Sequence, residues 1–355
     1  MLDGLTRPRS WADLRDVRYR GWLAVADPAH SGSIAATYNA IIQRKGWNEG
    51  WAILRRVFAN ARYFAAGASK VPLDTAAGEA AAGMCIDFYG RYQAAALGND
   101  RIEYVDPRLD VEGRNLENLP LETAVTADPI SILRGAPHAD LALEFVRWVL
   151  SKDGQRIWQR RAGVPGGPKK HELRRLPIRQ DMYVDEEMRH WRDQVRPFEV
   201  AQPLPSGMPS FYKAVAPVAH ALGIDVHDDL KAAWAAIVNH PNHQRRNEML
   251  AKFDAMPDGT DDSGQDMSLT VDWPDAISGK DVARILNDPS QPLHDDVVAA
   301  IKGFAERLKA RYTRSGSKRS WDDGDKLLRH RLAWTRFFRN NYREIVRIAR
   351  TPSDG

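Results

Sequence analysis

The chain has little of several features that would mark common protein classes. It contains one cysteine, Cys85, so it cannot form an internal disulfide bond. No run of about 18 apolar residues occurs, so no transmembrane helix is expected. Glycine-rich nucleotide loops and the GxSxG elbow are absent, and the His171-Glu172 pair lacks the second histidine of HExxH. The pair His240 and His243 lacks a third metal ligand. We therefore expect no enzyme, no cofactor and no metal centre.

Charge is ordinary overall but uneven along the 355 residues. The net charge is +4, with 43% apolar and 28% charged residues, which is typical of a globular protein. Residues 302–350 carry 15 Lys or Arg against 5 Asp or Glu. This tail also has a helical apolar stripe, which favours a helix that packs on the body and exposes a basic face. Contact with anionic lipid or nucleic acid is the other interpretation. The stripe comprises Leu328, Leu332, Thr335, Phe338, Tyr342, Ile345 and Ala349.

Residues 17–125 alternate between short apolar runs and helical periodicity. This alternation predicts a mostly parallel sheet covered by helices on both faces. Cys85 falls in one of the strands and is interpreted as a small buried apolar side chain. The predicted strands are residues 21–26, 84–88 and 102–105, and the predicted helices are residues 31–44, 47–59 and 74–82.

The rest of the chain is predicted to be largely helical. A polar surface insertion is expected before the crossover, and the acidic stretch DGTDDSGQD is interpreted as a linker because it lacks the ligand spacing of a calcium loop. The ranges are 106–121 for the insertion, 123–128 for the crossover, 128–255 for the helical region, 203–209 for a loop within it, 234–253 for a helical stretch in which 240–243 are interpreted as a loop, and 258–266 for the linker.

Ser31, Gly32 and Ser33 form the first candidate site. They follow the predicted strand that ends near Asp27 and open a predicted helix. Hydroxyls and free backbone N–H groups at a helix N-terminus can bind an anion, and Gly32 permits close approach. The alternative is simple capping of the helix by one of the serines.

Asp87, Tyr89 and Arg91 form a second candidate set at the end of a predicted strand, where α/β proteins place ligands. Arg91 could pair with a carboxylate or phosphate. Equally, Tyr89 could belong to the core and Arg91 to a surface ion pair. Thr126 and Asp128 in the crossover could line a cleft or only cap turns.

Residues 127–168 contain the most informative pattern. A polar turn and the short apolar run 130–133 precede a helix with Leu141, Phe145, Trp148 and Val149 on one predicted buried face. A PGGP loop ends the stretch. The order APxxxLAxxFVxWxLSxxGQxxW followed by PGGP resembles the C-terminal part of extracellular solute-binding proteins of ABC importers, in the branch that includes ferric-iron and phosphonate binders.

Two earlier blocks resemble the same family. Residues 11–33 look like its "tWaDLaDPrykGkialaDP..SGS" block, and residues 78–91 look like its "v..GEaa.G..idfyg" block. The resemblance covers residues 10–185. Ferric binders of the family usually present adjacent tyrosines where this chain has Phe88 and Tyr89, so the resemblance to iron binders is weaker at this point.

The resemblance implies an α/β fold of the type 2 periplasmic-binding-protein kind, with two lobes that close on a ligand. The resemblance implies two partners, the membrane permease and a small anionic or metal–anion ligand, with a sugar-like ligand as the alternative because the chain has 11 tryptophans. It also implies a monomeric chain that is periplasmic or extracellular, either free or lipid-anchored. Nucleic acid is not expected as a partner. The expected divisions are residues 17–125 as the second lobe, 126–257 as the remainder of an incomplete first lobe, and 258–355 as a linker and basic helical extension.

The N-terminus departs from that family pattern. Residues 1–10 carry no signal peptide, and the first βαβ units of the first lobe are missing. We expect a late gene start or a fragment. The alternative function is an intracellular ligand sensor, or a protein that binds nucleic acid or a membrane surface through the basic tail.

Overall fold

The computed structural model describes residues 4–98, 101–108, 121–201, 208–260, 264, 266–271, 295–312 and 321–351, with the side chains of 309–312 and 321–326 left aside. The chain divides into two units. Unit 1 comprises residues 1–86, 105–123 and 203–355, and unit 2 comprises residues 87–104 and 124–202. The predicted surface insertion falls largely outside the described residues, as does most of the loop at 203–209 and part of the linker at 258–266.

A small parallel sheet lies at the start of unit 1. Its strand order is β2-β1-β3, and the central strand β1 is buried along its whole length. Leu23 pairs with Ala61 of β2 and with Ala82 of β3. The strands are β1 (Leu23–Ala26), β2 (Ala61–Ala65) and β3 (Ala82–Gly83). The strand predicted at residues 21–26 is thus confirmed as β1, whereas β2 has no counterpart among the predicted strands.

Two antiparallel helices, α1 (Gly32–Lys45) and α2 (Trp47–Asn60), follow β1 as predicted to within a residue or so. Gly46 joins them with φ 78°, a left-handed conformation that favours glycine. The helices approach closely at Gly50, where a Cβ atom would lie 2.7 Å from the Cα of Ile42. Replacing either glycine would therefore strain this hairpin.

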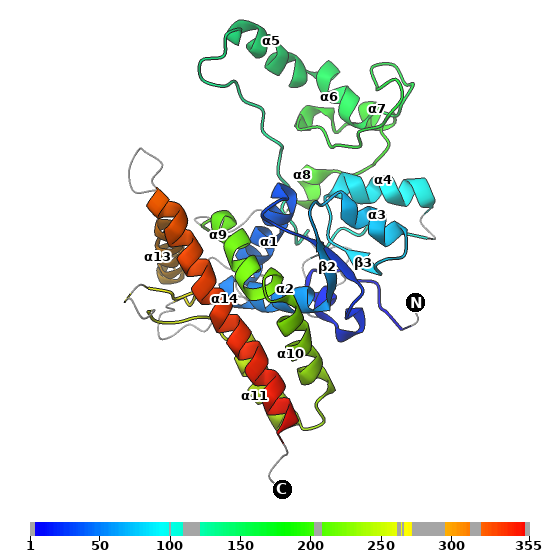
Figure 1. Cartoon of the computed structure of the whole chain (residues 1–355). Helices are drawn as coiled ribbons and strands as arrows, with labels where there is room; N and C mark the ends of the chain where they lie inside the picture. Colours follow the sequence, from blue (N-terminus) through cyan, green and yellow to red (C-terminus); the bar gives the residue numbers. More distant parts are fainter. Residues whose placement is uncertain are drawn as a thin grey trace. The chain divides into compact units, whose positions relative to one another are not determined.

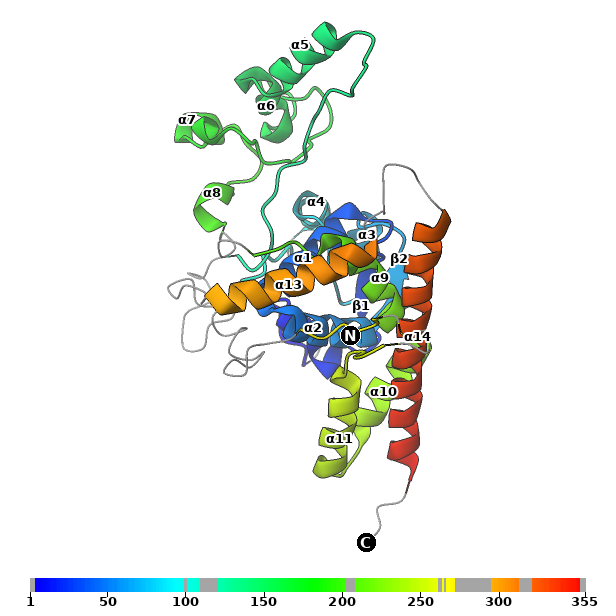
Figure 2. The ribbon, with the colours of Figure 1, turned by 90° about the vertical axis from the view of Figure 1, so that its left-hand side faces the viewer.

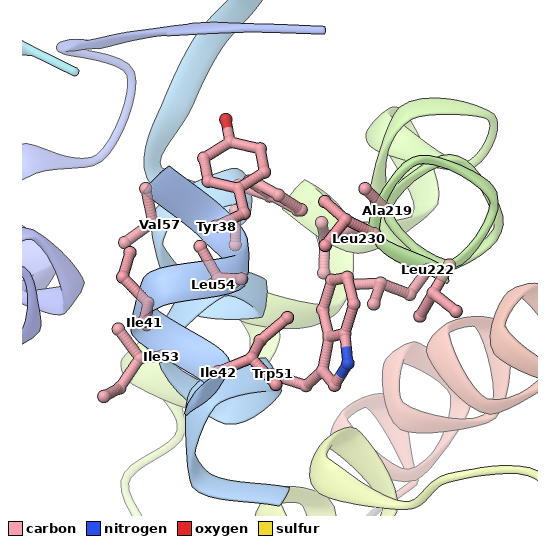
Figure 3. Packing of buried hydrophobic residues seen from close by; sticks show 14 of the residues in the cluster. Tyr38, Ile41, Ile42, Trp51, Ile53, Leu54, Val57, Ala219, Leu222 and Leu230 are labelled. Carbon is pink, nitrogen blue, oxygen red and sulfur yellow. The ribbon is translucent and has the colours of Figure 1, made fainter. Parts of the chain in front are cut away.

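The C-terminal half of unit 1 packs around that hairpin. Its helical segments are α9 (Tyr212–Ala219), η5 (His220–Ile224), α10 (His227–Asn239), α11 (His243–Asp254), α13 (Asp295–Tyr312) and α14 (Trp321–Arg350). Helix α14 runs beside α10, α11 and η5 (Figures 1 and 2). Trp51 of α2 lies beside Leu222 and Leu230 in the shared core (Figure 3). The tail helix is therefore part of the core of unit 1.

Several predicted elements differ from the structure. The helical stretch predicted at 234–253 forms two helices, α10 and α11, and the loop interpreted at 240–243 lies at their junction, where Pro241 interrupts the stretch and Asn242 caps α11 by accepting from Arg245 N–H at 3.0 Å. The helix predicted at 74–82 is α3 (Lys70–Ala76), and Gly78 with φ 79° follows its end. Of the predicted tail stripe, Leu328 and Leu332 are exposed, whereas Phe338, Tyr342 and Ile345 are buried. The short 3-10 segments η1 (Ala12–Arg15) and η2 (Val17–Tyr19) precede β1.

Unit 2 is helical, with a small apolar cluster of Met182, Met188 and Trp191. The strands predicted at 84–88 and 102–105 are wrong: residues 102–105 form no described strand, and Asp87 begins helix α4. Cys85 lies between β3 and α4 and is only partly buried. The helical segments of unit 2 are α4 (Asp87–Leu97), α5 (Ala139–Val149), α6 (Lys152–Gln159), η4 (Gln180–Met182), α7 (Asp185–Met188) and α8 (Pro197–Val200).

Helix α5 has the predicted apolar stripe, but the stripe is exposed. Leu141 is 66% exposed and Phe145 57%, and none of the described side chains of α5 is buried. The periodicity was correct for a helix with one apolar face, while the burial expected from it is wrong because no other described element of unit 2 covers that face.

This exposure predicts a small stability effect at a large aromatic residue. Phe145→Gln is expected to change the free energy of unfolding by less than about 0.5 kcal/mol, as for most surface substitutions. It should also reduce binding of the apolar dye ANS, because Phe145 stacks on Trp148 with ring centroids 6.1 Å apart and forms much of the exposed patch. Urea denaturation and dye fluorescence measure both. A loss above about 2 kcal/mol would mean that the face is covered in solution.

Candidate functional site

The serine pair lies where β1 gives way to α1. Ser31 is the N-cap residue of α1 and is buried, whereas Ser33 is half-buried. The Ser31 hydroxyl makes no capping hydrogen bond to the described first turn of α1, and its Oγ lies 3.3 Å from Ser33 Oγ. The first N–H groups of a helix have no intrahelical acceptors. Two hydroxyls and these N–H groups therefore lie together at the positive end of a 14-residue helix.

Asp27 shapes the turn that carries these serines. Its carboxylate accepts from Ala29 N–H at 2.8 Å, and its carbonyl accepts from the N–H groups of His30 (3.2 Å) and Ser31 (3.1 Å). The Asp27 N–H donates to Ala65 O of β2 at 2.8 Å. The turn is thus fixed to the sheet at one end and to α1 at the other.

Tyr212 of α9 lies over the start of α1. Its hydroxyl donates to Gly32 O at 3.4 Å, and a Cβ atom at position 32 would lie 3.4 Å from the same hydroxyl oxygen. Tyr212 is exposed and was not identified from the sequence. It adds a phenol next to the serine pair.

Asp87 and Arg91 lie in the first turns of α4, not at a strand end. They form an i, i+4 ion pair, which favours helix here over the predicted strand. Arg91 is buried; its Nε lies 3.5 Å from Asp193 Oδ2, and Arg174 donates to its carbonyl at 2.6 Å. Burial lowers the pKa of Arg91, but the charges of Asp87 and Asp193 outweigh it and the net pKa is raised. The side chain is therefore held within unit 2.

The remaining predicted site residues are exposed in unit 2. Tyr89 packs its ring against Phe88 with centroids 4.4 Å apart. Asp128 pairs with Arg175, whose guanidinium lies 4.2 Å from the Phe88 ring centroid. Thr126 lies in an extended exposed segment. The eight predicted residues thus fall into two sets, Ser31, Gly32 and Ser33 in unit 1 and the other five in unit 2, and their role in binding stays a prediction.

Other features of the described structure provide weaker candidates for a binding site. Within the described ranges, no three His, Cys, Asp or Glu side chains are grouped so as to hold a metal ion. Of the helices that the structure describes, none is both long and apolar enough to cross a membrane. A hollow beside α1 is lined by Ile42, Trp47, Phe211 and Phe304 among other apolar residues, so it has no group to hold an anion.

Comparisons with known proteins agree with the sequence blocks. The model of the family described as bacterial extracellular solute-binding protein matches residues 1–184, a little over half of the 355 residues. The chain belongs to this family of extracellular solute-binding proteins. The resemblance stated above and the α/β fold class with a helical C-terminal region are thereby confirmed.

Individual relatives of the solute-binding chain match only part of it. An uncharacterized protein of Haemophilus influenzae is 29% identical over 150 residues, which is 42% of this chain and 39% of that protein. The phosphoglycerate transport regulatory protein PgtC of Salmonella typhimurium is 30% identical over 153 residues, 43% of this chain and 34% of PgtC. The chain therefore matches less than half the length of these curated relatives.

One solved structure is also similar, the periplasmic binding protein AfuA of Actinobacillus pleuropneumoniae with bound fructose-6-phosphate. It is 24% identical and covers 44% of each chain, with a TM-score of 0.35.

The carboxylate of Glu187 makes unit 2 sensitive to acid. Arg156 Nε donates to it at 3.1 Å, and Arg160 Nη2 donates to it at 2.6 Å. The hydrogen bonds from Arg156 lower the pKa of Glu187, burial raises it, and the hydrogen bonds from Arg160 lower it further, so that the pKa is about 2. The pKa in the unfolded chain is about 4.3. The ionised Glu187 therefore contributes its full stabilisation of the folded state above about pH 4.3, and this contribution is lost as the pH falls toward 2.

Hydrogen exchange of peptides from residues 152–192 should therefore quicken between pH 5 and pH 2.5, after correction for the intrinsic pH dependence of exchange. Glu187→Gln should flatten this dependence, because glutamine does not titrate. An unchanged pH profile in the variant would contradict the assignment to Glu187.

Proposed function

We propose that this chain is the solute-capturing component of an ABC importer and that it binds a small anion at the N-terminus of α1. The observation that carries the proposal is the pair of serine hydroxyls that leave the first turn of α1 uncapped, 3.3 Å apart at the end of the central strand. A phosphate or carboxylate could accept hydrogen bonds from both hydroxyls and from the N–H groups of Gly32 and Ser33. Family membership supports capture of a solute.

A phosphorylated carboxylate is the ligand class we favour. The support is the name of the relative PgtC, a phosphoglycerate transport regulatory protein, together with the hydroxyl and N–H donors at the start of α1. Ferric complexes fit less well, because Tyr89 has Phe88 and not a second tyrosine beside it. Asp87, Tyr89, Arg91, Thr126 and Asp128 of unit 2 are also proposed as ligand-contact residues. Of these, Tyr89, Thr126 and Asp128 are exposed, whereas Arg91 is buried beside Asp87 and Asp193.

The proposed partner is a membrane permease, and the proposed location is the periplasm, as a monomer. We favour this over binding of lipid or nucleic acid by the tail, because three arginines of α14 pair with carboxylates from other elements of unit 1. Arg331 pairs with Asp225 at 2.7 Å, and Arg343 pairs with Asp229 at 3.0 Å.

A thermal-shift panel tests the proposal. It contains 3-phosphoglycerate, phosphate, a phosphonate, ferric citrate and a neutral sugar. A ligand at 100 times its Kd stabilises the native state by about 2.7 kcal/mol, so a rise of several degrees is expected with 3-phosphoglycerate and none with the sugar.

Ser31→Ala and Ser33→Ala should each reduce this shift. Ser69→Ala is the matched control, since Ser69 also precedes a helix and makes no capping bond to the described turn of α3. The proposed site would be contradicted if no anion in the panel raised the melting temperature, or if Ser69→Ala reduced the rise as much as the variants of Ser31 and Ser33.

A further inference from the structure

A line of polar contacts joins the turn at Asp27 to the C-terminal helix α14. His220 Nε2 lies 3.0 Å from Asp27 Oδ1, and its Nδ1 lies 3.1 Å from Asp225 Oδ1. Arg331 of α14 places Nη2 at 2.8 Å from the same Nδ1 and donates its Nε to Asp225 Oδ2 at 2.8 Å. Asp27 directly follows β1, His220 begins η5, Asp225 directly follows η5, and Arg331 lies in α14. The line therefore joins residues up to 304 positions apart in the sequence, from 27 to 331.

The backbone at His220 is unusual. Pro217 lies within α9, and residues 220–224 form the one π-helical segment in the part of the chain that the structure describes. Such π-turns are rare and occur often at functional sites. The His220 side chain is 13% exposed and that of Asp27 12%, so the contact between them is shielded from water.

Charged and polar groups alternate along this line. The guanidinium of Arg331 has only N–H donors and donates to both oxygens of Asp225, with Nη2 at 2.7 Å and Nε at 2.8 Å. The two ring nitrogens of His220 lie between the carboxylates of Asp225 and Asp27. Burial raises the pKa of Asp225, but hydrogen bonds from His220 and Arg331 outweigh it and the net pKa is lowered. Asp225 thus stays ionised and holds Arg331 in place.

We propose that His220 and Arg331 are positioning residues, through which the packing of α14 sets the conformation of the Asp27 turn and so the affinity of the α1 N-terminus for its ligand. The inference rests on the proposed function for its last step. His30 also contacts Asp27, at 3.2 Å, but its side chain is 67% exposed. His220 is therefore the shielded partner that restrains the carboxylate from the side of η5 and α14.

Hydrogen exchange followed residue by residue tests the positioning step without any ligand. His220→Leu and Arg331→Met remove the line, and His220→Gln keeps an amide donor that can reach Asp27. Exchange of the His30 and Ser31 amides, which donate to Asp27 O, should quicken at least tenfold in the first two variants. It should stay within threefold of the original chain in His220→Gln.

Arg343→Met is the matched control, because Arg343 also lies on α14 and pairs with Asp229 at 3.0 Å, away from the Asp27 turn. Equal quickening in this variant, or none in Arg331→Met, would overturn the inference. If His220→Leu does not fold, the exchange rates of Arg331→Met test the inference. Arg331 is partly exposed, so this substitution should not prevent folding.

Affinity for 3-phosphoglycerate tests the coupling step. The Kd should rise at least fivefold in Arg331→Met and stay unchanged in Arg343→Met. If the original chain binds 3-phosphoglycerate and Arg331→Met binds it equally well, the coupling is wrong while the proposed function stands. If the original chain binds no anion, the proposed function fails, and the exchange rates still decide whether His220 and Arg331 position the turn.

Discussion

Glu122→Ala is expected to destabilise unit 1 by about 3–5 kcal/mol, which would remove much of the stability of a typical domain. Glu122 is fully buried; Lys45 Nζ at the end of α1 lies 2.6 Å from its Oε1, and Trp11 N–H donates to its Oε2 at 2.8 Å. Removing the carboxylate takes away the negative charge that faces the buried ammonium of Lys45 and the acceptor of the Trp11 N–H. Urea denaturation followed by circular dichroism measures the loss.

Two further variants test whether the loss of stability comes from the buried ion pair or would follow the removal of any ion pair. Glu79→Ala removes an exposed pair with Arg62 at 3.1 Å and should cost less than about 1 kcal/mol. The double variant Lys45→Met with Glu122→Leu removes both charges and should be more stable than Glu122→Ala alone. A Glu122→Ala loss as small as that of Glu79→Ala would contradict the buried pair.

Trp334→Ala should also destabilise unit 1 by about 3–5 kcal/mol, because it leaves a large cavity in the core. Trp334 of α14 is fully buried and donates its indole N–H to Met267 O at 2.8 Å. The same stability measurement applies, together with hydrogen exchange of α10 and α11, which pack on α14.

Leu332→Ala is the control for this second prediction. Leu332 lies two positions away on the same helix and is 45% exposed, so its loss should cost less than about 1 kcal/mol. Equal effects at the two positions would indicate that α14 is not seated in the core as described.

The start of unit 1 could be predicted from the sequence because local signals agree there. The apolar run of β1 and the helical periodicity of α1 and α2 are separated by Asp27-Pro28 and Gly46, which mark each boundary. Strand β2 could not be predicted, because it begins at Ala61 directly after α2 ends at Asn60, and no connecting residue marks the boundary. At α5, periodicity predicts an apolar face but contains no information on what covers it, so the burial of Phe145 was predicted wrongly.

The candidate site was predictable only in its local part. Ser31 and Ser33 follow a strand and open a helix, a pattern that lies within one short segment. His220 and Arg331 could not be found in this way, since their relation to Asp27 arises from packing between residues far apart in sequence. For Arg91, the sequence left ligand binding and a structural ion pair open, and the structure places it in a buried ion-pair network.

The most direct test of anion binding at α1 is a ¹⁵N NMR titration of the labelled chain with 3-phosphoglycerate. The account predicts that the amides of Gly32, Ser33 and Ile34 show the largest shift changes, that these saturate with one Kd, and that Ser33→Ala raises that Kd. Saturable binding whose shift changes centre elsewhere, or amides at 32–34 that do not respond at any concentration of the ligand, would contradict it.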